Sequence, residues 1–248
     1  MTAEEIWREK SDDEVSAAMA AIDDYTEVGQ QIIREEVARR GLTRVTIAKV
    51  DAGLRADRIA RAVRWQSTIA TGSVVALVLN VLTHLPVLTG SSTFAEGLLR
   101  FNDVLYAVTG LLFVAWLHRA YSNLTLVGTR QVTYSTAWAV GCWFVPFLNL
   151  SRPYAIVDEL WTKSATKNTG EASTRGKRSP IPGLWWVALL GTAAVEMIGL
   201  RAGVVAPTFW KTYDILSLSA AVFAIVLVRR VNRNQRSFRD DLVLDEAV

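Results

Sequence analysis

Cysteine and histidine are almost missing from this sequence, whose 248 residues include one cysteine and two histidines. The single cysteine, Cys142, excludes an internal disulfide and a cysteine-rich metal site. The histidines, His84 and His118, lie near opposite ends of successive apolar segments, so we do not expect them to share a zinc ion. We therefore predict no bound metal and no cofactor.

Catalytic motifs are missing as well. The sequence has no glycine-rich phosphate loop, no serine nucleophile flanked by glycines, and no pair of histidines around a glutamate at zinc-protease spacing. Without such a motif, no residue is marked as a nucleophile with its base. We therefore predict that the protein is not an enzyme.

The first 64 residues lack a long apolar run, and they lack the basic start and short apolar core of a signal peptide. We expect the N-terminus to stay on the side of the membrane where it is made. The net charge of +3 comes from basic residues beside the ends of apolar segments. That placement is typical of membrane topology signals, so we predict no nucleic-acid partner.

Apolar residues make up 51% of the chain and charged residues 21%. A membrane protein can have both only if apolar and charged residues lie in different segments. In this sequence they do. Four later segments are nearly free of charge, and each has about the 20 residues that a helix needs to cross roughly 30 Å of hydrocarbon. We predict an all-α, multi-span membrane protein with a transmembrane domain over 65–235. The predicted spans are 66–88, 101–118, 183–204 and 209–228.

Basic residues give these helices an orientation. The second span ends in an aromatic and basic belt at 116–121, arginines follow the last span from Arg229, and the loop 163–182 is rich in lysine and arginine. Such clusters favour the cytoplasmic side of a membrane. We predict an inner or plasma membrane protein with both termini in the cytoplasm, including the tail 236–248. The arginine-rich segment 43–64 is predicted to be a juxtamembrane anchor for lipid headgroups.

One apolar segment, 133–150, does not fit a simple span. Pro146 interrupts it and Pro153 follows it, and both of its flanks are predicted to be cytoplasmic. If both flanks are cytoplasmic, the chain between them must cross the membrane an even number of times or not at all. The charged stretch 154–161 is too short to cross back, so a full crossing by 133–150 would have no return. We favour a re-entrant or interface-lying helix broken between the prolines. A fifth full span is the alternative.

The first 42 residues predict a small cytoplasmic helical hairpin. Ser11 and Glu14 form a capping-box pattern at the start of its first helix, and the second helix is expected over 26–40, ending at Gly41. One narrow apolar stripe is too little for an independent core. The hairpin is either a solvated pair of helices or a docking module, for a partner helix or for the cytoplasmic face of the membrane domain.

An aromatic and proline-containing motif connects the middle segments: W-F-x-P-x-x-N-L-x-R-P-Y, followed by E-L-W. Together with V-A-W-L-H-R-A-Y-S-N-L at the end of the second span, it resembles the bacterial membrane domain known as domain of unknown function 4328 (DUF4328). The resemblance implies an integral membrane location and several helices, and it supplies no activity, ligand or catalytic residue. The residues that carry it are 114–124, Trp138, 143–146, Asn149, Leu150, 152–154 and 159–161.

Ionisable residues inside the spans are costly in hydrocarbon and are the first candidates for function. Glu196 has small neighbours on one helix face, so we expect its carboxyl to point into the bundle, and Asp214 lies at a similar depth on the next span. The pair could share a proton or bind a cation. The alternative is a buried, hydrogen-bonded Glu196 with Asp214 paired to Lys211. Asn80 and His84, one turn apart, either line a polar path or form an internal hydrogen bond.

A second group of polar residues is predicted at the cytoplasmic end. Because Arg152 and Glu159 are two helical turns apart, they cannot satisfy each other, and Arg119 is the expected partner of Asp158 or Glu159. The group is either a salt-bridge clamp that fixes the broken helix to the bundle or a pocket for an anionic headgroup or small ligand. Its members are Arg119, Asn123, Asn149, Arg152, Asp158 and Glu159.

These features favour a non-enzymatic membrane protein that acts through lipids, a protein partner or complex assembly. The bilayer, anionic lipid headgroups and an unknown protein that docks on the N-terminal hairpin are the candidate partners. The alternative function is a small transporter or channel that uses Glu196 and Asp214.

Overall fold

A computed structural model describes residues 2–89, 95–126, 132–165, 179–204 and 206–245, with side chains omitted at 84–89, 95–101, 207 and 238–245. The described residues form helices and no strands, which confirms the all-α prediction. The chain divides into two compact units. The first extends from the N-terminus to Arg61, and the second comprises Ala62–Asp240.

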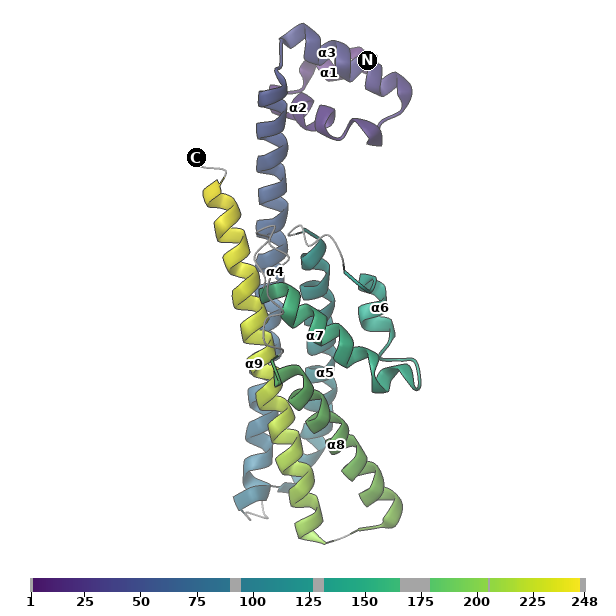
Figure 1. Ribbon diagram of the computed structural model, residues 1–248, viewed down its shortest axis with the longest axis vertical. Helices are drawn as coiled ribbons and strands as arrows, with labels where there is room; N and C mark the ends of the chain where they lie inside the picture. The colour runs from purple at the N-terminus through teal and green to yellow at the C-terminus, as the bar shows by residue number, and fades with distance from the viewer. Residues whose placement is uncertain (1, 90–94, 127–131, 166–178, 205, 246–248) are drawn as a thin grey trace. The chain divides into compact units, whose positions relative to one another are not determined.

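The first unit contains three short helices (Figure 1) and a 3-10 turn, and α4 begins within it. Capping boxes at Thr2 and Ser11 begin α1 and α2, and Gly41 ends α3 with a left-handed φ of 66°. The sequence predicts the second and third of these helices, and α1 is additional. Their bounds are α1 Ala3–Glu9, α2 Asp12–Ala20, η1 Ile22–Asp24 and α3 Glu27–Arg40.

The side chain of Arg40 connects the helices of the first unit. Its guanidinium donates to the backbone oxygens of Trp7, Arg8 and Lys10 at the end of α1, at 2.7–3.1 Å. It also forms ion pairs with Asp12 at 2.8 Å and with Glu36 at 2.6 Å. Arg40 therefore satisfies carbonyls that the end of α1 leaves without helical partners.

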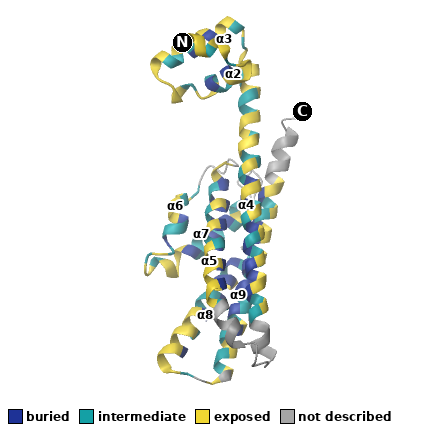
Figure 2. Cartoon of the chain, turned by 180° about the vertical axis from the view of Figure 1, so that it is seen from behind, coloured by how far each residue is buried: buried dark blue, intermediate teal, exposed yellow. Residues whose placement is uncertain are grey.

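The second unit is built around four long helices that alternate in direction (Figure 1). Buried residues gather on the sides of α5, α7 and α9 that face one another, whereas much of α8 is exposed (Figure 2). Gly199 lets α8 approach α9 closely, since a Cβ at this position would lie 2.8 Å from the ring of Phe209. The helices are α4 Arg44–Thr89, α5 Ala95–Leu126, α8 Ile181–Ala202 and α9 Pro207–Asp245.

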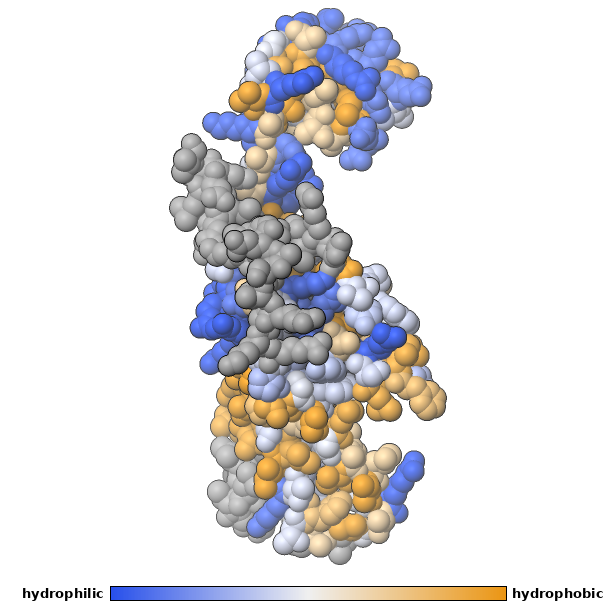
Figure 3. Space-filling model, in the orientation of Figure 1, coloured by the Kyte–Doolittle hydropathy of each residue, from blue (hydrophilic) through white to orange (hydrophobic). Residues whose placement is uncertain are grey.

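Three helices of the described residues are long and apolar enough to cross a membrane: Arg44–Thr83, Asn102–Leu126 and Ile181–Ala202. Fewer than half of the positions in each apolar stretch are buried, so most positions are at least partly accessible. In the second unit the exposed apolar side chains gather toward the end where α8 meets α9 (Figure 3). This distribution indicates a membrane protein. The fourth predicted span, 209–228, lies in α9 and stays a prediction.

The proline-containing segment forms two helices that fold back on each other. The first, α6, spans Thr136–Gly141, and α7 spans Arg152–Ala165, with the 3-10 turn η2 at Leu148–Leu150 between them. A helix of six residues covers only about 9 Å, far less than the roughly 30 Å of hydrocarbon. The 14 residues of α7 cover about 21 Å, so neither helix of this segment is long enough for a crossing.

The break in this segment differs from the predicted one. The first helix already ends at Gly141, before Pro146, and Phe147 has a positive φ of 66°. Pro153 lies in the first turn of α7, where its missing N–H leaves no helical bond unmade. The turn is thus made by residues 142–147, and Pro153 helps the second helix to begin rather than ending the first.

Candidate functional site

The carboxylate of Glu159 is the centre of a hydrogen-bonded network on α7. The hydroxyl of Tyr121, on α5, donates to Glu159 at 2.6 Å, and Thr133 donates from its backbone N–H and its hydroxyl at 2.8 Å each. Lys163 completes the network with an ion pair of 2.7 Å. The Tyr121 oxygen also accepts from the backbone N–H of Tyr134 at 3.1 Å. One carboxylate thus joins α5, the chain before α6, and α7.

This environment changes the proton affinity of Glu159. Burial alone would raise the pKa of the carboxyl, but the donors Lys163, Tyr121 and Thr133 outweigh that effect and lower the pKa below its ordinary value. Glu159 is therefore ionised at neutral pH and serves as an acceptor only. The network holds α5, the chain before α6 and α7 together, and we call it the Glu159 clamp.

A clamp around Glu159 is present, but it does not contain the cation that the sequence predicts. Arg119 is exposed and pairs with neither Asp158 nor Glu159 among the side chains that the structure describes. Tyr121 takes its place because it points to α7, whereas Arg119, two residues earlier, is turned about 160° away around the helix. Arg152 instead donates to the hydroxyl of Tyr134 at 3.1 Å and lies 5.8 Å from its ring.

Buried amides form a second polar layer, which the sequence analysis missed. Asn123 donates to the Gln66 side-chain oxygen at 2.6 Å, so it does not join the Glu159 group as predicted. Gln235 donates to the backbone oxygen of Ala120 at 2.9 Å and to the hydroxyl of Ser164 at 3.3 Å. This layer connects α4, α5, α7 and α9. Its only sequence signal is a lone amide near the end of each apolar segment.

An apolar cavity of about 730 Å³ lies between α4, α5, α8 and α9, and the turn 143–150 forms part of its wall. None of the described side chains that line it is charged. Asn149, predicted in the cytoplasmic group, lines this cavity instead, together with Asn80. Its aromatic wall consists of Phe113, Trp143, Trp185 and Trp186, whose ring centroids lie 5.3–6.3 Å apart in contacting pairs.

The predicted intramembrane carboxylates occupy different environments. Asp214 is 5% exposed, whereas Glu196 is exposed, so the expectation that its carboxyl points into the bundle is wrong. The rings of Phe209 and Trp210 fill the space beside Gly199 that was expected to face the carboxyl.

Glu196 and Asp214 both act electrostatically on Tyr213, but Asp214 alone is buried. Lys211 is exposed, and its predicted pairing with Asp214 stays a prediction. The side chain of His84 lies outside the described residues. Across the part of the chain that the structure describes, no group of three His, Cys, Asp or Glu residues is placed to hold a metal ion.

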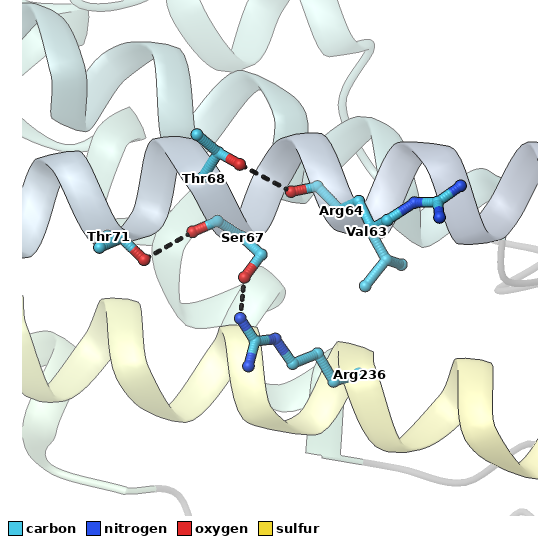
Figure 4. A pocket seen from close by; sticks show the side chains of 6 residues that line it. All are labelled: Val63, Arg64, Ser67, Thr68, Thr71 and Arg236. Carbon is cyan, nitrogen blue, oxygen red and sulfur yellow. Dashed lines mark hydrogen bonds between the residues drawn. The ribbon is translucent and has the colours of Figure 1, made fainter.

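A hollow of about 380 Å³ lies between α4 and α9 (Figure 4). Arg64 and Arg236 lie on its two sides, and Arg236 donates a hydrogen bond to Ser67. The hydroxyls of Thr68 and Thr71 donate to helix carbonyls. No carboxylate is among the described residues that line the hollow.

Long apolar helices, an uncharged cavity between them and a basic end define a helical membrane protein. The chain belongs to the family described as Domain of unknown function (DUF4328), whose model matches residues 79–233, more than half of its length. This match confirms the resemblance inferred from the sequence and includes the Glu159 network and every described residue that lines the cavity except Leu77. No curated protein and no solved structure matches the chain.

Proposed function

We propose that this protein is a non-enzymatic membrane protein that binds a lipid-soluble molecule in the cavity between its helices. The cavity supports this proposal by its volume of about 730 Å³, which lies within the roughly 300–1,000 Å³ of small-molecule sites. Its described lining is mostly apolar and carries no charged side chain, which suits a hydrocarbon chain.

The mouth of the cavity supports the same ligand class. Gly110 and Leu111 of α5 and Ala193 of α8 line the cavity and are exposed, and both helices belong to the candidate spans. An opening between two spans faces hydrocarbon rather than water. The ligand therefore enters sideways from the bilayer.

The basic end of the second unit completes the proposed membrane arrangement. Arg64 and Arg236 offer guanidinium groups to anionic headgroups, and the exposed Trp65 is typical of a membrane interface. We place this end, with both termini, on the cytoplasmic side of a bacterial inner membrane. Between α6 and α7, Phe144, Phe147 and Leu150 are exposed, which favours a turn that dips into the interface and returns.

The proposed function is tested by a substitution that fills the cavity. Gly110 lines it, and a Cβ there would meet nothing within 4 Å, so Gly110→Phe attaches a ring at an open position of the wall. We expect roughly tenfold less crosslinking to a photoactivatable fatty acid in native membranes, because the ring occupies the ligand's space. Gly72→Phe is the matched control, since Gly72 has the same free space and does not line the cavity. Equal crosslinking of both variants would refute the proposal.

Transport through Glu196 and Asp214 is the second candidate, supported by the burial of Asp214 within α9. The two functions differ in whether the protein conducts ions. If Glu196→Gln abolishes ion flux in liposomes that the parent chain supports, the transport function is favoured. Lipid binding predicts no such flux and unchanged crosslinking. The N-terminal unit stays the proposed docking site for a protein partner.

A further inference from the structure

The hollow between α4 and α9 brings together two arginines from different helices. Arg236 extends from α9 toward α4, and Arg64 extends along α4 (Figure 4). Both side chains are exposed, and neither forms an ion pair with a described side chain. Among the described residues, the Arg236 guanidinium donates only to the Ser67 hydroxyl, which is a neutral acceptor. Since a guanidinium carries several N–H donors, each arginine keeps donors for a ligand.

The floor of the hollow is a polar face of α4. Ser67, Thr68 and Thr71 follow Arg64 by three, four and seven positions, so they lie on one side of the helix. The hydroxyls of Thr68 and Thr71 donate to carbonyls of α4, which leaves the guanidinium groups as the donors that a ligand meets. Because the described lining holds two cations and no carboxylate, it favours an anion.

The position of the hollow along the helices favours one kind of anion. Trp65, which follows Arg64, is 63% exposed, and the charge-free part of the first candidate span begins after it. On α9, Arg236 lies seven residues, or about 10 Å, beyond Arg229, where the charge-free run ends. Tryptophan and arginine at the end of apolar helices are typical of the headgroup layer. The anions of that layer are phosphates, whose oxygens match the fork of a guanidinium.

We propose that the hollow is a binding site for one phosphate group, which Arg236 and Arg64 hold between α9 and α4. Arg236 already points across the hollow, and the exposed side chain of Arg64 turns toward the same anion. The inference goes beyond the proposed function, because it concerns a second site and does not depend on the apolar cavity. The phosphate belongs to a phospholipid headgroup or is free phosphate from the cytoplasm, and the chemistry of binding is the same.

The test counts bound lipid by native mass spectrometry on the delipidated full-length chain in a neutral detergent. Dioleoyl phosphatidylglycerol and dioleoylglycerol are the two probes, since they share their acyl chains and only the first has a phosphate. We expect one phosphatidylglycerol per chain, bound at least roughly tenfold more tightly than dioleoylglycerol, because its phosphate accepts charge-assisted hydrogen bonds. This comparison needs no variant.

Substitutions of single arginines separate a discrete site from general attraction of charge. Arg64→Gln and Arg236→Gln should each weaken phosphatidylglycerol binding roughly tenfold and leave dioleoylglycerol binding unchanged. Arg236→Lys keeps the charge without the fork, so it should restore only part of the affinity. Arg233→Gln is the matched control, because it removes the same charge from an exposed position of α9 that does not line the hollow. It should bind phosphatidylglycerol as the parent chain does.

Inorganic phosphate distinguishes the two sources of the group. A headgroup site keeps phosphatidylglycerol when millimolar phosphate is added. A site for free phosphate instead binds inorganic phosphate in place of the lipid, and Arg64→Gln and Arg236→Gln remove that binding. Equal binding of phosphatidylglycerol and dioleoylglycerol by the parent chain overturns the proposal. An equal loss of phosphatidylglycerol binding in Arg233→Gln overturns it too, since net charge alone then attracts the lipid.

Discussion

Replacing Glu159 by alanine is expected to lower the free energy of unfolding of the second unit by about 3 kcal/mol, the largest stability effect that we expect from one substitution there. The change removes the acceptor of the Tyr121 hydroxyl and of two Thr133 donors, and the Tyr121 side chain is fully buried. It also leaves Lys163 without its Glu159 partner. Thermal unfolding in detergent measures the loss.

Asp158→Ala is the control for this prediction. Asp158 is the neighbouring acid on α7 and belongs to no ion pair among the described side chains, so its replacement should change stability by less than about 0.5 kcal/mol. Equal losses for the two variants would show that the clamp does not depend on the Glu159 carboxylate.

The lowered pKa of Glu159 gives the clamp a pH dependence of known sign. Since the folded pKa lies below the ordinary value of 4.5, the stabilisation is fully present above about pH 4.5 and is lost as the pH falls through the folded pKa. Glu159→Ala should flatten this part of the stability profile.

Replacing Arg40 by alanine is expected to release α1 from the first unit. The guanidinium binds three backbone oxygens at the end of α1 together with Asp12 and Glu36, and alanine can replace none of these bonds. Amide hydrogen exchange over 3–20 should become roughly tenfold faster or more, because local opening no longer breaks these contacts.

Arg39→Ala provides the comparison for Arg40. Arg39 also pairs with Glu36, but its side chain is 55% exposed, and its hydrogen bonds to described residues stay within α3. An exposed ion pair contributes little, so exchange in α1 should stay unchanged. Faster exchange in both variants would assign the effect to Glu36 rather than to the bonds with α1.

Local signals in the sequence predict much of the fold. Ser11 and Gly41 mark helix ends through capping and left-handed geometry, and these depend only on neighbouring residues. The charge-free segments predict membrane helices because length and composition are also local properties of the sequence. The end of α6 at Gly141 could not be predicted from the sequence, because the chain after it is held by the contacts of Trp143 with Trp185 and Trp186 of α8.

The site is less predictable because it depends on helix rotation. Successive residues of a helix differ by about 100° around its axis, so Tyr121 and Arg119 point in different directions although both lie near the end of α5. Only the position of α7 decides which of them meets Glu159. The amide pair of Gln66 and Asn123 lies 57 positions apart in sequence, and the cavity exists only between assembled helices.

The roles proposed for the cavity mouth, the basic hollow and the segment between α6 and α7 all depend on one claim. The claim is that the second unit crosses the membrane with its basic end inside the cell. Two exposed residues at opposite ends of its helices test this claim: Ala165, at the end of α7, and Ala206, between α8 and α9. Ala165 is preferred to the neighbouring Ser164, which is 1% exposed.

Each alanine is changed to cysteine in a Cys142→Ser background, and whole cells are treated with a membrane-impermeant maleimide. The account predicts that Ala206→Cys reacts from outside and that Ala165→Cys reacts only after the membrane is permeabilised. Labelling of Ala165→Cys in intact cells would contradict it.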